Sequence, residues 1–261
     1  MKWYITGDVH QDFTRFRNLP EYKDDTQEVG VIVLGDCAVN WTLDPERDAG
    51  LKRQLCKRYH NFHWYFVRGN HDARPEDVPT MESIYDWDVR GFVWYESKYP
   101  NIHYFKDGEL YGIDKLTILV IGGAYSVDKE YRLARGAIWH ANEQLNEIER
   151  YEILNKIKNY NVDIVLTHTA PISWEPTDLF LPMLDQSKVD KSMELWLDEV
   201  RQSITFKIWL FGHYHRDRAE RPGVQMIYTA IEELDTIWHR WTDPNGLEWF
   251  FPKGPMYYAG R

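Results

Sequence analysis

The 261-residue sequence has few cysteines and no long apolar run. Its two cysteines, Cys37 and Cys56, provide no disulfide framework, which suits a reducing compartment. No run approaches the roughly 18 apolar residues that a membrane span requires. The first six residues lead directly into Gly7 and Asp8, which is too early for the apolar core of a signal peptide. We therefore expect a soluble, cytoplasmic protein that does not enter a membrane.

The sequence also lacks an excess of positive charge. It contains 31 Lys and Arg against 41 Asp and Glu, for a net charge of −10. Proteins that bind long nucleic acids usually present a basic face, because neutralising phosphates supplies much of their affinity. We therefore expect no long nucleic acid as a partner. An acidic protein can still bind a phosphorylated molecule where bound cations reverse the local field.

What is present is enough apolar material for a sizeable core. Hydrophobic residues make up 43% of the chain, and its length is near the upper limit for a single core. No repeat, low-complexity tract or linker divides it. We predict one domain, residues 1–261.

Six short apolar runs end in glycine or polar residues. Runs of four to six mostly β-branched or aromatic residues are typical of buried strands. Strands that all end in polar residues predict an α/β sheet core with a common edge, where open α/β sheets bind ligands. The predicted strands occupy residues 3–6, 29–34, 62–67, 116–121, 162–166 and 208–211.

Helices and irregular stretches separate these strands. The predicted helices span residues 44–60, 141–158 and 188–201. Residues 74–112 and the proline-rich residues 171–186 have no clear period, and we interpret both as loops on the substrate side of the sheet edge. Residues 224–241 alternate as a strand and hairpin would.

Polar side chains that can bind a metal follow five of the predicted strands. Their position at the carboxyl ends of strands gathers residues distant in sequence around one rim. Carboxylate, imidazole and amide groups together suit first-row metals such as Mn, Fe, Co, Ni and Zn. In chain order these residues are Asp8, His10, Asp36, Asn70, His71, Asp72, His168, His213 and His215.

Spacing and number favour two metal ions over one. Asp8 and His10, like His213 and His215, are two residues apart, so extended backbone points both members of each pair to one side. With one further Asp, Asn and His, there are too many candidate ligands for one cation. Two cations about 3.5–4 Å apart can clamp a phosphoryl group during in-line displacement.

Each motif by itself has a structural alternative. The segment from Asp8 to His10 fits a turn or a helix cap, residues 70–72 fit a turn with Asx chemistry, and His168 alone fits a core histidine. The joint occurrence of these motifs, in order and each at a strand end, favours a two-metal site.

Taken together, the motifs extend from residue 7 to residue 215. They are Gly7-Asp8-Val9-His10, Gly35-Asp36, Gly69-Asn70-His71-Asp72, His168 and Gly212-His213-Tyr214-His215. This set resembles the calcineurin-like metallophosphoesterase superfamily, in its bacterial or phage-type metallophosphatases. The resemblance implies a four-layer α/β/β/α sandwich with a dimetal site at the carboxyl ends of the strands.

The resemblance also implies roles for the residues. Two divalent transition-metal ions would hold a bridging hydroxide, with Mn expected and Fe, Ni, Co or Zn as alternatives. Asp8, His10 and His215 would bind the first ion, Asn70, His168 and His213 the second, and Asp36 would bridge them. His71 would be the general acid, and Asp72 would orient the His71 ring.

The chain departs from the phosphoprotein phosphatase branch of this superfamily. Cys37 follows Asp36 where that branch has arginine, and Asp72 stands where it has glutamate. Arg68 matches the branch and either grips a phosphate bidentately or forms a surface ion pair. Arg132 and Arg135 contact substrate from the rim or are solvated.

We therefore predict a metal-dependent phosphoester hydrolase, with phosphomonoesterase activity favoured. Its substrate would be a phosphorylated small molecule or a phosphoprotein. The alternatives are a phosphodiesterase acting on small nucleotides and a non-catalytic protein-binding scaffold of the same fold.

Overall fold

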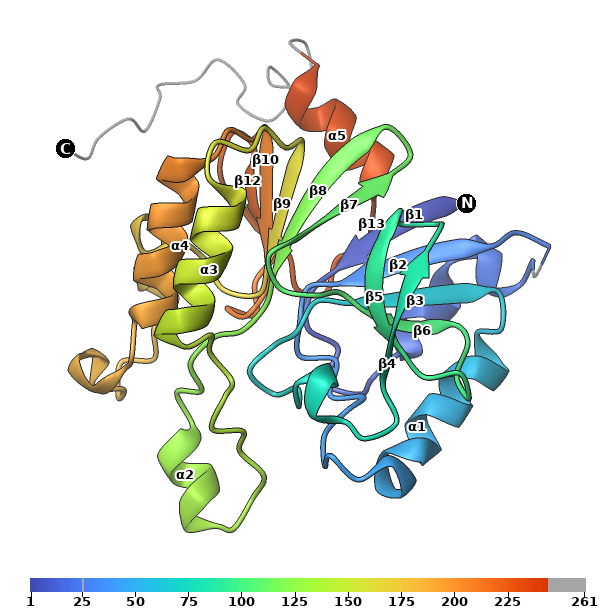
Figure 1. The fold of residues 1–261 in the computed structure, drawn as a ribbon, viewed down its shortest axis with the longest axis horizontal. Helices are drawn as coiled ribbons and strands as arrows, with labels where there is room; N and C mark the ends of the chain where they lie inside the picture. Colours follow the sequence, from blue (N-terminus) through green and yellow to red (C-terminus); the bar gives the residue numbers. More distant parts are fainter. Residues whose placement is uncertain (25, 244–261) are drawn as a thin grey trace.

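Two β-sheets lie face to face between helices (Figure 1), in a computed structural model that describes residues 1–24 and 26–243. The predicted domain, residues 1–261, thus includes residue 25 and residues 244–261, which lie outside the described residues. Within the described part of the chain, no helix is both long and apolar enough to cross a membrane.

The first sheet is built around four parallel strands. Strands β1, β2, β3 and β6 are parallel, and β13, β5 and β4 join the two sides in antiparallel pairs. Across the sheet the order is β13 (Glu232–Glu233), β1 (Lys2–Thr6), β2 (Val29–Val33), β3 (Phe62–Phe66), β6 (Ile102–Tyr104), β5 (Gly91–Tyr95) and β4 (Glu82–Asp86).

The second sheet has the same character. Strands β12, β10, β9 and β8 are parallel, with antiparallel β11 and β7 at the two edges. Across the sheet the order is β11 (Arg218–Arg221), β12 (Val224–Met226), β10 (Ile208–Phe211), β9 (Ile164–Thr167), β8 (Leu116–Ile121) and β7 (Glu109–Ile113).

Alternation along the strands explains why the sheets pack in layers. Successive side chains of a strand point to opposite faces. Ile5 of β1 and Leu210 of β10 lie in the core between the sheets, whereas Tyr4 and Phe211 pack on the outer faces. Burying each such side chain contributes about 1.5–3 kcal/mol.

Helices cover both outer faces (Figure 1). Helix α1 packs on the first sheet through Leu55, while α3 and α4 pack on the second through Ile157 and Val200. The layers are those of the predicted α/β/β/α sandwich, which is confirmed. The helices are α1 (Pro45–Arg58), α2 (Lys129–Ala134), α3 (Glu147–Ile157), α4 (Ser192–Ser203) and α5 (Leu234–Thr242).

Capping residues mark where two of the predicted helices begin. The Asp44 side chain accepts a hydrogen bond from the backbone N–H of Glu46, with Pro45 at the first helical position of α1. Asn146 and Glu149 form a capping box at the start of α3. Helix α3 therefore begins later than the predicted residues 141–158.

All six predicted strands are present, but two other predictions are wrong. Residues 74–112 are not a loop, because they contain β4, β5, β6 and the start of β7. Their aromatic residues are good strand formers, and the Pro and Asp residues between them obscured the strands. Residues 224–241 contain β12 and the two-residue β13, which lie in different sheets and so form no hairpin, and the chain then continues into α5. Leu234, Ile237 and Trp241 lie at helical spacing and pack into the core.

Candidate metal centre

The loops after β1, β2, β3, β9 and β10 bring the predicted ligands together at one edge of both sheets. Glycine lets these loops approach closely. Gly35 has a φ of +96°, and a Cβ at this position would overlap the His168 ring. A Cβ at Gly69 would overlap the carboxylate of Asp36. The glycines of the motifs are thus required by the packing of the ligands.

Backbone strain is concentrated at the same edge. Four of the predicted ligands have positive φ, which is uncommon for residues other than glycine and often marks functional sites. They are His10 (43°), Asp36 (50°), His213 (67°) and His215 (52°).

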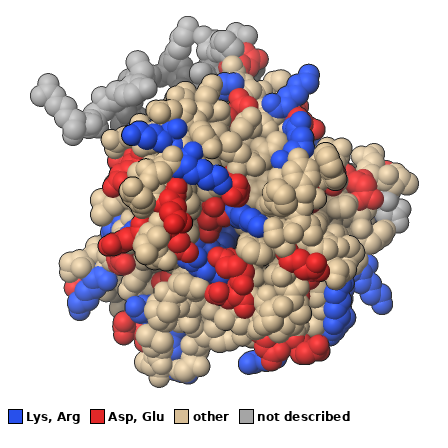
Figure 2. Space-filling model, in the orientation of Figure 1, with Lys and Arg blue, Asp and Glu red and all other residues tan. Residues whose placement is uncertain are grey.

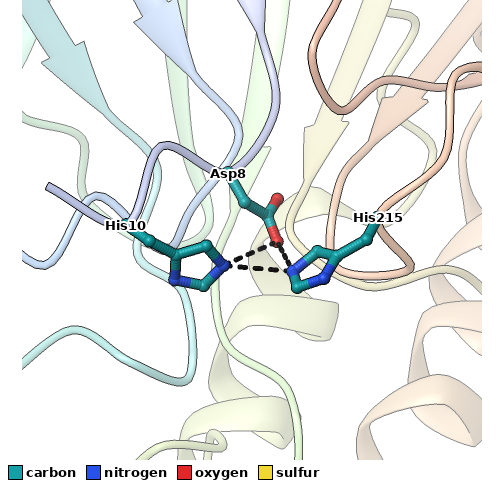
Figure 3. A group of neighbouring side chains, drawn as sticks. All are labelled: Asp8, His10 and His215. Atoms are coloured by element: carbon teal, nitrogen blue, oxygen red, sulfur yellow. Dashed lines mark hydrogen bonds and ion pairs between the residues drawn. The ribbon is translucent and has the colours of Figure 1, made fainter. Parts of the chain in front are cut away.

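The first group of ligands consists of Asp8, His10 and His215 (Figure 3). His215 Nε2 lies 3.1 Å from Asp8 Oδ2, and His10 Nε2 lies 4.0 Å from the same oxygen. The two Nε2 atoms are 3.1 Å apart. Three atoms that can donate electron pairs thus face one point, which fits a bound cation.

The second group contains His168, Asn70 and Asp36. His168 Nδ1–H donates to the carbonyl oxygen of Leu34 at 2.7 Å, so the lone pair of a neutral ring lies on Nε2. That Nε2 lies 2.9 Å from Asn70 Oδ1 and 3.4 Å from Asp36 Oδ1. The Nδ2 amide of Asn70 donates to Ser126 Oγ at 3.0 Å, which leaves Oδ1 facing His168. Three acceptors therefore converge without a proton between them, an arrangement that a cation would stabilise.

The charges at the centre also fit cations. Burial, together with the carboxylates of Asp8 and Asp72, raises the pKa of Asp36 well above its usual value. Burial opposes ionisation of Asp8 too, but hydrogen bonding from His215 and the nearby His168 hold its pKa below the ordinary value. Two buried carboxylates thus share one small space. Divalent cations would neutralise both, and the donor set suits first-row metals.

His213 lies beside this second group. Its ring centroid is 5.0 Å from that of His168, and its backbone N–H donates to Asp8 Oδ1 at 3.1 Å. Burial lowers the pKa of His213, which keeps the ring neutral as a ligand must be. All seven predicted ligands are therefore gathered at the centre. Their division between two ions stays a prediction.

His71 stands at the border of the centre. Its backbone N–H donates to Asp36 Oδ1 at 2.8 Å, and its Nε2 lies 3.9 Å from Asp36 Oδ2. On the other side of the ring, Nδ1 lies 2.7 Å from Arg132 Nη2. Burial and the Arg132 charge lower the pKa of His71 to about 3.

A pocket of about 410 Å³ opens on this centre. Its floor includes Asp36, Asn70 and His71, and much of its wall comes from residues 175–191. None of the described residues that line it belongs to residues 74–112. Part of the pocket wall, from Glu175 to Gln186, therefore comes from the predicted segment 171–186.

Comparison with models of protein families shows to which family the chain belongs. The model of the calcineurin-like phosphoesterases matches residues 1–217, a range that includes every predicted ligand. The chain belongs to this family. It is therefore a hydrolase of phosphoric ester bonds, and the family implies divalent metal ions at the centre described above.

Two solved structures are similar to this calcineurin-like phosphoesterase. The crystal structure of TT1561 of Thermus thermophilus is 14% identical, with 89% of this chain and 98% of that chain covered and a TM-score of 0.43. A second crystal structure is 12% identical, with 90% and 95% covered and a TM-score of 0.46. No curated protein matches the sequence.

The prediction for Asp72 in this phosphoesterase requires correction. Its carboxylate accepts hydrogen bonds from the backbone N–H groups of Gly69 at 2.7 Å and Ala38 at 2.6 Å. Asp72 thus ties together the loops after β2 and β3. The side chain that hydrogen-bonds to the His71 ring is that of Arg132, which is buried and not solvated.

Arg68 matches neither of its predicted roles. Only 2% of its side chain is exposed, and its guanidinium donates to the Asp107 carboxylate at 2.9 and 3.2 Å. It also donates to the carbonyl oxygens of Glu143 and Gly122. A buried guanidinium with these partners joins three segments and does not reach a phosphate in the pocket.

Sequence reasoning missed the residues that support the ligands from outside. The Tyr228 ring stacks on His215 with centroids 4.6 Å apart and planes at 19°. Arg15 donates to the carbonyl oxygens of Tyr228 and Asp8. Ser126 receives the Asn70 amide, as described. These residues belong to no motif, because their contacts arise only from the folded chain.

Proposed function

We propose that this phosphoesterase is a phosphomonoesterase for a small phosphorylated molecule or a phosphoprotein side chain. The observation that carries the proposal is the pocket of about 410 Å³ that adjoins the metal centre. Its volume is in the range of pockets that bind one small ligand. Residues 175–191 form much of the wall of this pocket, and the wall leaves room for one leaving group beside the phosphoryl group.

The charge of the pocket wall also supports this choice. Lys191 is the cation among the described lining residues, and its Nζ lies 2.6 Å from Glu175 Oε1. Glu194 is buried in the same wall. A leaving group rich in phosphates would meet little positive charge there. On the face of the described residues in Figure 2, acidic and basic side chains are interspersed without a broad basic patch, which disfavours binding of long nucleic acids to this face.

In the mechanism that we propose, the ligand residues would hold the divalent ions beside the pocket. The divalent ions, when bound, neutralise phosphoryl oxygens and acidify water. Asp36 accepts a hydrogen bond from the backbone N–H of His71 and lies close to both His10 and His168, so it joins the two groups of ligands. Leu179, Phe180 and Leu181 from the wall exclude bulk water from the leaving group.

His71 directs Nε2 toward Asp36, which also lines the pocket. The sequence predicted that this residue is a general acid. Because the Nδ1 atom accepts from Arg132, the neutral ring carries its proton on Nε2. We propose that Nε2–H donates a hydrogen bond to the departing oxygen as negative charge develops on it.

The second candidate is a phosphodiesterase acting on small nucleotides. Tyr125, Phe180 and Tyr214 line the pocket, and aromatic rings of this kind stack on bases. This alternative keeps the metal chemistry and changes the substrate.

Hydrolysis of two aryl phosphates, a monoester and a diester, tests the proposal. Metal-stripped protein is supplied with Mn²⁺, the metal that we propose, or with Zn²⁺, Fe²⁺, Co²⁺ or Ni²⁺. Monoester hydrolysis that depends on added Mn²⁺ supports a Mn²⁺ phosphomonoesterase, and preference for the diester supports the second candidate. Failure to bind any divalent metal would leave the scaffold alternative.

We also propose a cytoplasmic location, supported by the free thiols of Cys37 and Cys56.

A further inference from the structure

Arg132 lies on residues 122–146, the segment between β8 and α3, which we call the arm, and this arm holds it against His71. The arm follows β8 of the second sheet and carries the short helix α2, which extends away from the sandwich in Figure 1. His71 follows β3 of the first sheet. The 2.7 Å contact between Arg132 Nη2 and His71 Nδ1 therefore joins the two halves of the molecule beside the metal centre.

The contact determines which nitrogen of His71 carries a proton. A guanidinium has only N–H donors, so His71 Nδ1 must accept. A neutral ring then carries its proton on Nε2, the atom that faces Asp36. If Nδ1 were protonated, two donors would face each other at 2.7 Å.

Trp41 completes the arrangement by fixing the plane of the ring. Its ring stacks on His71 with centroids 5.8 Å apart and an angle of 9° between the planes. The Arg132 guanidinium carbon lies 4.9 Å from the centroid of the Trp41 ring, within the range of a cation–π contact. Trp41 thus holds both the imidazole and the guanidinium.

Stability alone gives a poor account of Arg132. Only 5% of the residue is exposed, and its Nη1 group has no hydrogen-bond partner. The Nε atom lies 3.6 Å from Asp128, whose side chain is 43% exposed. A buried charge with an unsatisfied N–H group is costly, and replacing it with an apolar side chain is often neutral for folding.

We propose that Arg132 is a positioning residue that sets the tautomer and orientation of His71, so that Nε2–H faces the substrate. This inference rests on the proposed function for the direction of the leaving group. It assigns Arg132 no direct contact with the substrate.

The test compares Arg132→Met with Arg135→Met in Zn²⁺-loaded protein. Arg135 lies on the same arm, is exposed and contacts Tyr131, so its variant is the matched control. Nitrogen NMR of the histidine rings reports which nitrogen of His71 carries the proton. We expect a proton on Nε2 in the wild type and the control, and a mixture of tautomers in Arg132→Met. Unchanged His71 signals in Arg132→Met would overturn the proposal.

Kinetics on the aryl monoester gives the second readout. We expect kcat to fall about tenfold to a hundredfold in Arg132→Met, as for other groups that orient catalytic side chains. KM should change little, because Arg132 does not touch the substrate. Arg132→Lys should restore part of kcat, since an ammonium is also only a donor. A large rise in KM with unchanged kcat would instead indicate direct substrate binding.

The two proposals can fail separately. If the protein hydrolyses neither ester, the proposed function is wrong, but the His71 signals still decide the role of Arg132. Thermal unfolding checks that Arg132→Met is folded. If it is not, Arg132→Gln, which offers both a donor and an acceptor, is compared by the same NMR signals with Arg132→Lys, which offers donors alone. A proton on His71 Nε2 in Arg132→Lys and mixed tautomers in Arg132→Gln support the proposal, whereas the same tautomers in both variants contradict it.

Discussion

The metal centre has a buried half and an exposed half, and they are held in different ways. The buried half, Asp36, Asn70 and His168, has side chains that are at most a few per cent exposed. The exposed half consists of His10 and His215, with 36% and 49% of their side chains exposed. Both halves meet at the buried carboxylate of Asp8.

Partners outside the centre orient the buried half. His168 donates to Leu34, and Asn70 donates to Ser126, which in turn donates to Glu143. His10 and His215 instead contact each other and Asp8, with Tyr228 stacked on His215. The buried half is thus held by residues outside the centre, whereas the contacts of the exposed half are mainly among its own members and Asp8. We therefore expect tighter metal binding in the buried half.

Asp36→Asn should have the largest effect, because it acts on both halves. Losing a ligand should exceed the tenfold to hundredfold cost of losing a residue behind a ligand. We expect hydrolysis to fall by more than about a hundredfold, with weaker binding of both ions. Calorimetric titration of metal-stripped protein with Mn²⁺ measures the binding. Weaker binding of only one ion would contradict the position that we propose for Asp36 between the two ions.

Glu194→Gln tests how far the enclosed environment of the buried half extends. Glu194 accepts from Thr169, the neighbour of His168, and burial raises its pKa from 4.5 to about 7. Between these pH values the folded state binds more protons than the unfolded state, so the free energy of unfolding falls as pH rises through this window. The loss amounts to about 3 kcal/mol.

Urea unfolding at several pH values measures this effect. We expect Glu194→Gln to be more stable than the wild type at about pH 8 and similar to it near about pH 4. Glu199→Gln, an exposed change on the same helix, is the control. Equal pH dependence in Glu194→Gln and the wild type would mean that Glu194 is ionised at little cost.

Ser126→Ala acts on the buried half alone. It removes the acceptor of the Asn70 amide, so Asn70 Oδ1 is less well oriented, and we expect about tenfold weaker binding of one ion. Titration with Mn²⁺ checks this. Ser173→Ala, which removes an exposed hydroxyl bonded to Asp198, is the matched control and should bind as the wild type does.

Tyr228→Leu acts on the exposed half and should have the smallest effect. A ring stack contributes about 0.5–1.5 kcal/mol, so we expect metal affinity in the exposed half to fall about twofold to tenfold. Tyr151→Leu, at an exposed position on α3, is the control. A larger loss than for Ser126→Ala would reverse the comparison of the two halves.

Much of the strand framework could be predicted from sequence. The apolar runs at β1, β2, β3, β8, β9 and β10 lie deep in the core, where alternation and burial leave a clear pattern. Strands β4 and β5 could not be recognised, since β4 is the edge strand of its sheet and its neighbour β5 has exposed residues such as Phe92. Helix α5 was not recognised because the apolar residues of a short segment can fit both the helical and the strand period.

The sequence by itself indicated the family and the set of candidate ligand residues. Both are carried by local motifs, in which a glycine and its polar neighbours at a strand end keep fixed spacing. Only the tertiary structure decided the partners of those residues. Arg132 contacts His71, which is 61 positions away in the sequence, and Arg68 donates hydrogen bonds to Asp107. The Asp72 carboxylate accepts hydrogen bonds from backbone N–H groups of the loops after β2 and β3. Such contacts depend on how two sheets dock, and no local pattern in the chain encodes that docking.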